Sequence, residues 1–165
     1  ARLKLPQEDE VCDIYLKTVD FLEKKGIKQY EISNFAKDGF VCAHNMKYWN
    51  CEEYLGIGPA SHSFYNGKRF FVKRDINAFL ESEIQKTELE ETHPAGAEEY
   101  AMLRLRLREG LDLKEYKKRG GNADKMTENI KKLPNRLVYI KNGRVLLTPE
   151  GFLVSNAVIG AALGY

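Results

Sequence analysis

The sequence predicts a mixed α/β plus α+β protein, in which one α/β unit is followed by a helical, winged-helix-like C-terminal domain. Three observations lead to this prediction. An amphipathic helical stretch precedes an apolar β-forming stretch near the N-terminus, two Asn-Gly pairs mark tight hairpins, and helix-capping residues surround the second hairpin. We place the domain boundary near residue 75, which gives domains over residues 1–74 and 75–165.

The first expected element is a helix that ends before Gly26. Pro6 and an acidic first turn favour its start, because carboxylates are stabilised at the positive end of a helix dipole. Residues 27–33 then favour a strand. One helix and one strand cannot form a barrel, so we interpret the chain as an internal cut from a longer protein. The apolar stripe of the helix has helical spacing and consists of Val11, Ile14, Tyr15, Thr18 and Leu22.

A hairpin and a short helix are expected next. Asn66-Gly67 predicts a tight turn between the apolar stretches that flank it. Asp75 is a favourable N-cap for a helix that reaches residue 84. The acidic residues 88–91 favour a solvated connector.

Residues 95–109 allow two interpretations. Leucines alternate with arginines over 103–108, which by period alone favours a strand. Nearly every residue over 97–109 is a strong helix former, however, and Gly110 supplies a stop. We therefore predict a helix.

The remaining chain predicts the winged-helix-like arrangement of two helices, a hairpin and a last helix. Asp112 and Asn122 are N-caps for helices that end at Arg119 and Leu133. Asn142-Gly143 predicts a type I′ turn between residues 137–140 and 145–147. Thr148-Pro149 caps and starts a single helix through residue 159.

Composition excludes some classes of protein. The chain is 43% hydrophobic and 30% charged, which argues against disorder, and no apolar run approaches the length of a membrane span. Three cysteines without disulfide-framework spacing favour reduced thiols and a cytoplasmic location. Residues 111–147 hold 10 Lys and Arg against 4 Asp and Glu, so a nucleic-acid-binding module is an alternative for this region.

One run holds most of the unusual chemistry, and it resembles a known family. It comprises YEISNFA over 30–36, an HNxxYW motif over 44–49 and EYLGIGPASHSF over 53–64. Together these motifs are similar to the radical S-adenosylmethionine heme chaperones, which are paralogues of the oxygen-independent coproporphyrinogen III oxidases. The resemblance implies that residues 1–74 are the last α/β unit of a partial barrel. It also implies heme, S-adenosylmethionine and a [4Fe–4S] cluster in the full-length parent.

The HNxxYW motif suggests a heme site. The imidazole of His44 is a suitable axial ligand of heme iron, and Tyr48 and Trp49 offer flat apolar faces to a porphyrin. If the segment is helical, Tyr48 lies one turn from His44 on the same face. The resemblance implies heme binding by His44, Asn45, Tyr48 and Trp49. The alternative is a loop histidine bonded to a backbone carbonyl.

The GIG segment is a candidate edge of an S-adenosylmethionine site. Gly56 and Gly58 remove two Cβ atoms, which lets a ligand approach the backbone. The resemblance implies that Ile57 packs near the adenosyl group. A strand end before the Pro59 turn explains the glycines as well. The cluster motif CxxxCxxC is missing, so we expect no [4Fe–4S] cluster and no radical chemistry from this chain alone.

Two further constellations favour structural roles. Cys42, His44, Cys51 and His62 could supply four zinc ligands, but they lack the close pairs usual in structural sites. His62 is interpreted as structural, because Ser61-His62-Ser63 is too local for a catalytic triad. The polar residues Glu31, Ser33 and Asn34 end the predicted strand, where either a functional group or a capped terminus fits.

The sequence therefore predicts part of a heme chaperone that binds heme and passes it to an unidentified acceptor protein. The first alternative is an oxygen-independent coproporphyrinogen III oxidase, which decarboxylates two propionates to give protoporphyrinogen IX. The second is a winged-helix module that binds nucleic acid; acidic residues in its expected recognition helix, Asp124 and Glu128, argue against sequence-specific binding. We expect no catalytic residue in this chain and no specific nucleic-acid partner.

Overall fold

The structure is a computed structural model that describes residues 5–165. Its first helix, α1 (Glu8–Lys24), confirms the predicted position, and Gln7 and Glu10 form a reciprocal capping box at its start. The predicted apolar stripe is rotated from the buried face. Val19 is buried, whereas Val11 and Ile14 are 49% and 56% exposed. No helix among residues 5–165 is long and apolar enough to cross a bilayer.

The strand predicted over 27–33 is much shorter. Only β1 (Lys28–Gln29) forms, and it pairs antiparallel with β2 (Phe35–Ala36). The chain turns between them, and the N–H of Tyr30 donates to the carbonyl of Asn34 at 3.1 Å. Within this turn, Glu31 makes an isolated bridge with Leu107, which joins this unit to the C-terminal part of the chain.

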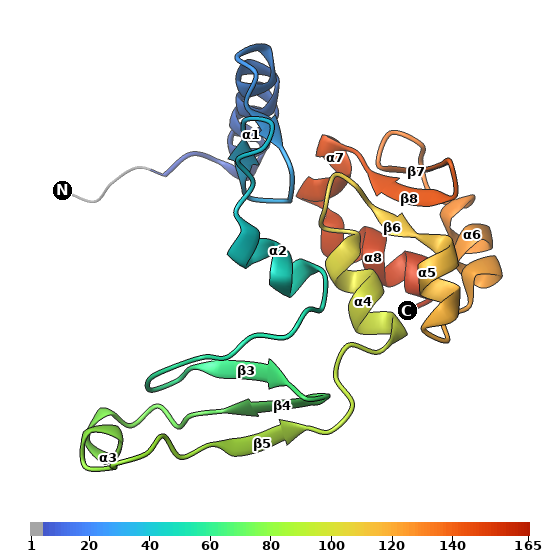
Figure 1. The fold of residues 1–165 in the computed structure, drawn as a ribbon. Coiled ribbons are helices and arrows are strands. Elements are labelled where there is room, and N and C mark those ends of the chain that lie inside the picture. Colours follow the sequence, from blue (N-terminus) through green and yellow to red (C-terminus); the bar gives the residue numbers. More distant parts are fainter. Residues whose placement is uncertain (1–4) are drawn as a thin grey trace.

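A three-stranded sheet projects as an arm from the rest of the molecule (Figure 1). It contains β3 (His62–Tyr65), β4 (Lys68–Phe71) and β5 (Glu88–Glu91), and α3 (Ile76–Leu80) lies near its tip. The hairpin at Asn66-Gly67 is confirmed, with φ of 49° and 68°. The predicted connector over 88–91 is wrong, because these acidic residues pair with β4 and Arg69 bonds Glu91 at 3.0 Å.

The pairing of β4 with β5 also bears on the domain boundary. A boundary at residue 75 would divide this sheet between two domains. Strands of one sheet share backbone hydrogen bonds and do not form separate folding units. We therefore propose a boundary between residues 91 and 97, where the chain leaves the arm and enters the helical domain (Figure 1).

The helix predicted over 95–109 forms only in part. Helix α4 (Ala97–Arg104) ends earlier than expected. The chain then turns, so that Leu105 and Leu107 are both fully buried and Leu107 reaches the bridge with Glu31. A turn thus buries both leucines, whereas a continuous helix would place side chains two residues apart on different faces.

The C-terminal domain contains the predicted helices and hairpin. They are β6 (Leu111–Asp112), α5 (Leu113–Lys118), α6 (Ala123–Ile130), β7 (Val138–Lys141), β8 (Arg144–Leu147), α7 (Pro149–Leu153) and α8 (Ser155–Leu163). Strand β6 adds a third strand, in the order β6-β8-β7. Asp112, Asn122 and Thr148 accept backbone hydrogen bonds as N-caps. The prediction of a single last helix is wrong, because the helix is interrupted at Val154 and forms α7 and α8.

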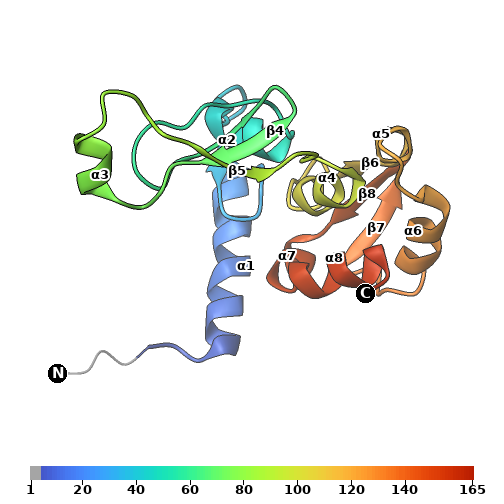
Figure 2. The same cartoon turned by 90° about the horizontal axis from the view of Figure 1, so that it is seen from below.

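Most of the hydrophobic core lies in this domain. Figure 2 shows α6, α7 and α8 beside its small sheet. The buried side chains come from all of these elements and include Leu105, Leu111, Met126, Val138, Val145, Leu147 and Phe152. The arm and α1 bury far fewer side chains, so the helical domain forms the rigid base from which they extend.

Candidate functional site

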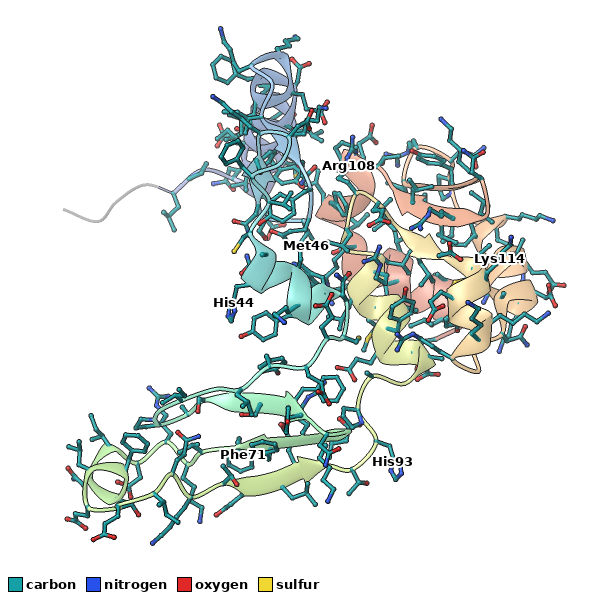
Figure 3. The ribbon with its side chains drawn as sticks, in the orientation of Figure 1. His44, Met46, Phe71, His93, Arg108 and Lys114 are labelled. Atoms are coloured by element: carbon teal, nitrogen blue, oxygen red, sulfur yellow. The ribbon has the colours of Figure 1, made fainter. Side chains whose placement is uncertain are left out.

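The HNxxYW motif forms a short helix, α2 (Ala43–Trp49). It lies between α1 and the arm, and its far end packs against α4 (Figure 1). Figure 3 shows His44 on the side of α2 that faces away from the C-terminal domain. Because the motif is helical, His44, Lys47 and Tyr48 lie on one face of α2.

A hydrogen bond joins the side chains of His44 and Tyr48. The hydroxyl of Tyr48 lies 2.9 Å from Nε2 of His44, and the two rings meet edge to face with centroids 5.0 Å apart. Tyr54 packs edge to face against Tyr48 at 4.5 Å. If Nε2 carries the proton and donates to Tyr48, Nδ1 keeps a free lone pair that can bind a metal.

An open depression of about 480 Å³ lies next to His44. Its walls combine apolar or aromatic side chains with two charged ones: His44, Lys47, Glu53, Tyr54, Leu55 and Tyr65. Leu55 is 63% exposed and Tyr65 is 51% exposed, so the depression presents apolar surface to solvent. Burial raises the pKa of the Tyr54 hydroxyl above its ordinary value, so this group stays protonated well above physiological pH. An imidazole beside apolar walls and a cation fits a heme.

The other two motif residues lie differently. Asn45 and Trp49 are half-buried, and neither belongs to the walls of the depression. Trp49 therefore does not present its ring face beside His44, as the sequence suggested, and its burial favours packing. The heme-contacting roles of Asn45 and Trp49 remain predictions.

Helix α2 is anchored by a buried arginine that sequence reasoning did not single out. Arg104, at the end of α4, donates to the side chain of Asn50, the C-cap of α2, and to Glu109 at 2.8 Å. Its side chain is only 8% exposed. The alternating leucines and arginines marked this stretch, but nothing in the sequence connects it with Asn50, which lies 54 residues earlier.

The GIG segment is held by a residue from the far part of the arm. The N–H of Gly58 donates to Oε1 of Gln85 at 2.9 Å, and the amide of Gln85 donates to the carbonyl of Gly56 at 3.0 Å. A Cβ on Gly56 would collide with the carbonyl of His62, and Gly58 has a φ of 99°. These contacts account for both glycines structurally. Ile57 is 87% exposed.

The candidate zinc ligands are not gathered. Among residues 5–165, no three His, Cys, Asp or Glu side chains are placed to hold a metal ion. Burial raises the pKa of the Cys51 thiol, which disfavours the thiolate that binds metals. His62 lies at the start of β3, where its Nδ1 is 3.0 Å from Glu90 and its ring stacks on Phe71. Both contacts are consistent with a structural role.

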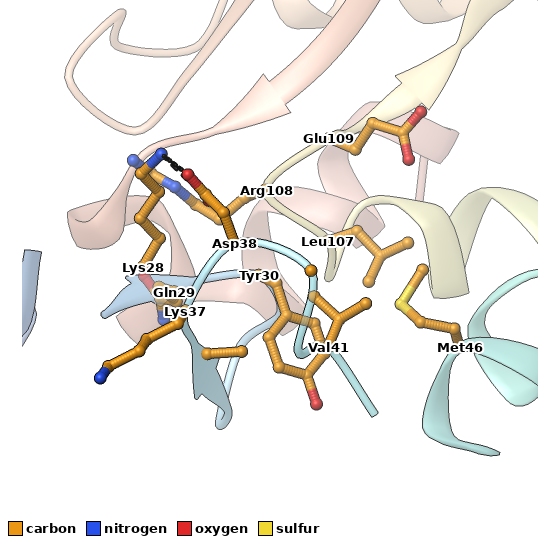
Figure 4. A pocket seen from close by; sticks show the side chains of 12 residues that line it. Lys28, Gln29, Tyr30, Lys37, Asp38, Val41, Met46, Leu107, Arg108 and Glu109 are labelled. Atoms are coloured by element: carbon orange, nitrogen blue, oxygen red, sulfur yellow. Dashed lines mark hydrogen bonds and ion pairs between the residues drawn. The ribbon is translucent and has the colours of Figure 1, made fainter. Parts of the chain in front are cut away.

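The strand-end residues divide into buried and exposed groups. Glu31 is 1% exposed, and one of its carboxylate oxygens has no hydrogen-bond partner among the described residues. Ser33 and Asn34 are exposed. A cavity of about 360 Å³ lies beside this strand, with Tyr30, Val41, Met46 and Leu107 among its walls (Figure 4). This cavity is on the other side of α2 from His44 and shares no wall residue with the depression.

Comparisons with known proteins agree with the motif evidence. Residues 92–154 match the model of the HemN C-terminal domain. The chain is 34% identical to the heme chaperone HemW of Bacillus subtilis, over 99% of this chain and 45% of the relative. It is 32% identical to HemW of Lactococcus lactis, over 94% of this chain and 43% of the relative.

The chain is similar to the HemW proteins, and its residues 92–154 are similar to the HemN C-terminal domain.

It spans less than half of the length of these HemW proteins. The fold is also similar to that of a solved structure. The chain superposes with a TM-score of 0.66 on the solved Escherichia coli coproporphyrinogen III oxidase HemN, a radical SAM enzyme. That match covers 98% of this chain and 42% of the enzyme, at 16% identity.

Proposed function

We propose that this chain supplies the heme-binding region of a heme chaperone. The observation that carries the proposal is the exposed His44 beside an open depression with apolar and aromatic walls. The relatives named heme chaperone HemW support it. An imidazole nitrogen supplies an axial ligand to heme iron, and exposed apolar side chains cover one face of the porphyrin.

The open geometry suits a carrier. His44 and Tyr48 lie at the surface, with Tyr48 38% exposed, and the depression is not enclosed by a lid among residues 5–165. When Nε2 carries the proton, it donates a hydrogen bond to the Tyr48 hydroxyl, which orients the imidazole and leaves Nδ1 free to bind the iron. A ligand held on an open face can pass to an acceptor protein without a large opening step. We propose an acceptor protein as the partner and a cytoplasmic location, based on three free thiols.

The coproporphyrinogen III oxidase alternative is tested by asking whether the protein transfers intact heme or decarboxylates a porphyrin. A chaperone releases intact heme, so hemin-loaded chain mixed with an apo-hemoprotein should yield the spectrum of that acceptor. An oxidase instead removes two carboxylates from coproporphyrinogen III, which mass spectrometry of the porphyrin detects. Decarboxylation by the protein with its upstream region, without heme transfer, would favour the alternative.

The cysteines of this chain do not fit a [4Fe–4S] cluster. Cys12, Cys42 and Cys51 are free thiols, and no three such ligands are gathered within residues 5–165. In the GIG segment, the N–H of Gly58 and the carbonyl of Gly56 are already bonded to Gln85.

Anaerobic reconstitution of the chain with iron and sulfide should therefore give no stoichiometric cluster. Three thiolates must converge on one cluster, and the spacing of these three prevents it. Iron counting and absorbance after desalting measure the result. A stable cluster with stoichiometric iron and sulfide would overturn this expectation.

The basic C-terminal module should not bind duplex DNA with sequence preference, and any binding should be weak and confined to low salt. In α6, Met126 and Ile130 are buried, and the exposed positions include Asp124 and Glu128 beside Lys125. Lysines alone bring about salt-sensitive, sequence-independent binding. Affinities for two unrelated duplexes across a salt series provide the measurement. A preference for one duplex that persists at physiological salt would restore the nucleic-acid alternative.

A further inference from the structure

The depression beside His44 contains groups that match the other parts of a heme. Heme has carboxylate-bearing propionates at one edge and a large apolar face. We propose that Lys47 binds a heme propionate and that Leu55 packs against the porphyrin face. This inference rests on the proposed heme binding at His44, and it assigns the orientation of the ligand in that site.

Lys47 is the cation best placed for a carboxylate. It lies three residues after His44 on α2, so that both side chains leave the same face of the helix and line the same depression. Among residues 5–165, its ammonium forms an ion pair only with Glu52, at a long 3.9 Å. Both side chains of that pair are about half exposed, and such pairs contribute little to stability. A propionate can therefore replace Glu52 at little cost.

The other charge in the depression does not compete for the same ligand group. Glu53 accepts the N–H of Asn66 at 2.6 Å and so stabilises the turn between β3 and β4. This contact ties Glu53 to the hairpin. A ligand carboxylate is attracted to Lys47 and repelled by Glu53, so the propionate edge should lie toward α2 rather than toward the hairpin.

Leu55 supplies the apolar contact. It is 63% exposed, although leucine is usually buried, and its neighbours in the depression include the rings of Tyr54 and Tyr65. The Tyr54 backbone pairs with Phe64 of β3, with N···O distances of 2.8 and 3.0 Å, which fixes the strand position from which Leu55 projects. A flat apolar ligand that covers this leucine removes its side chain from water.

The test uses hemin and hemin dimethyl ester, whose propionates carry no charge. For Lys47→Gln we expect hemin binding to weaken about tenfold, the usual value of one charge-assisted hydrogen bond, with an unchanged Soret position. The ester should bind the variant and the parent chain equally. Leu55→Asn should weaken binding of hemin and of the ester alike, because the apolar contact is common to both ligands.

Lys17→Gln is the matched control. Lys17 also lies on a helix and forms an exposed pair, with Asp13 at 3.3 Å, but it does not line the depression. It should bind both ligands like the parent chain.

The outcomes separate this inference from the proposed function. If His44→Ala changes the Soret band while Lys47→Gln and Lys17→Gln bind hemin equally well, heme binding stands and the propionate assignment is wrong. If Lys47→Gln weakens the binding of hemin and of the ester equally, the loss has a structural cause and the propionate assignment is wrong. If His44→Ala leaves the spectrum unchanged, the proposed function fails, whatever the lysine variants show.

Discussion

Replacing His44 by alanine should shift the Soret band of the hemin complex and weaken binding on the order of a hundredfold. Loss of even an outer-shell partner of a metal ligand costs 10–100-fold in affinity, so loss of the ligand itself should reach at least the upper end of that range. Hemin titration of the parent chain and the variant, followed by absorbance, measures both effects. His44 is exposed, so its removal should not disturb folding.

His62→Ala is the matched control. His62 is the other histidine of the motif region, and it is also exposed, but it bonds Glu90 on the sheet of the arm. Its removal should leave the Soret position unchanged. Hemin also adheres to exposed apolar surface, so the spectral shift decides rather than the affinity alone. A shift with His62→Ala, and none with His44→Ala, would show that the wrong histidine has been assigned.

In the same titration, Tyr48→Phe separates the contribution of the ring to hemin binding from that of the hydroxyl. From the motif alone, Tyr48→Phe should change hemin binding little, because the aromatic ring is retained. The structure adds a hydrogen bond of 2.9 Å between the hydroxyl and Nε2 of His44. Without it, either nitrogen of the imidazole can face the iron, since the second partner of a ligating histidine fixes its tautomer. The variant should therefore retain a histidine-ligated spectrum but bind hemin about tenfold more weakly.

Local chemistry explains which elements could be predicted from the sequence. Asn66-Gly67 and Asn142-Gly143 adopt positive φ at both positions, as a type I′ turn requires. The side chains of Asp112 and Asn122 accept the N–H groups of the first turns that they cap. In each case the residues that determine the element lie within a few positions of it.

The errors occur where a distant partner determines the structure. Residues 88–91 are acidic and exposed, and only their pairing with β4 makes them a strand. Helix α4 ends before Leu107 because both leucines are buried and Leu107 pairs with Glu31. A continuous helix would not bring both side chains to these partners. The same limit applies to the candidate site. HNxxYW indicates His44, but Gln85 and Arg104 act on segments 27 and 54 residues away.

Arg104→Ala should produce the largest loss of stability among the variants considered. The buried guanidinium bonds both Asn50 and Glu109, so the change leaves the C-cap of α2 without this partner and opens a cavity beside α4. Hydrogen bonds to a buried charge and the group left unpaired together cost about 3 kcal/mol. For a chain of this size that corresponds to a melting temperature lower by roughly 6–12 °C. Urea and thermal unfolding followed by circular dichroism measure the change.

Two variants test whether the double contact of Arg104 is responsible. Arg104→Lys keeps the charge, but one ammonium lacks the planar fork that reaches Asn50 and Glu109 together, so its loss should lie between those of the parent chain and Arg104→Ala. Arg106→Ala removes a neighbouring arginine whose bond to Asn156, 3.0 Å long, is exposed, and it should cost about 1 kcal/mol or less. Equal losses of unfolding free energy for Arg104→Ala and Arg106→Ala would mean that the buried contact does not stabilise the fold. Since Asn50 caps α2, a specific loss with Arg104→Ala should also broaden the Soret band of the hemin complex, because His44 is then held less rigidly.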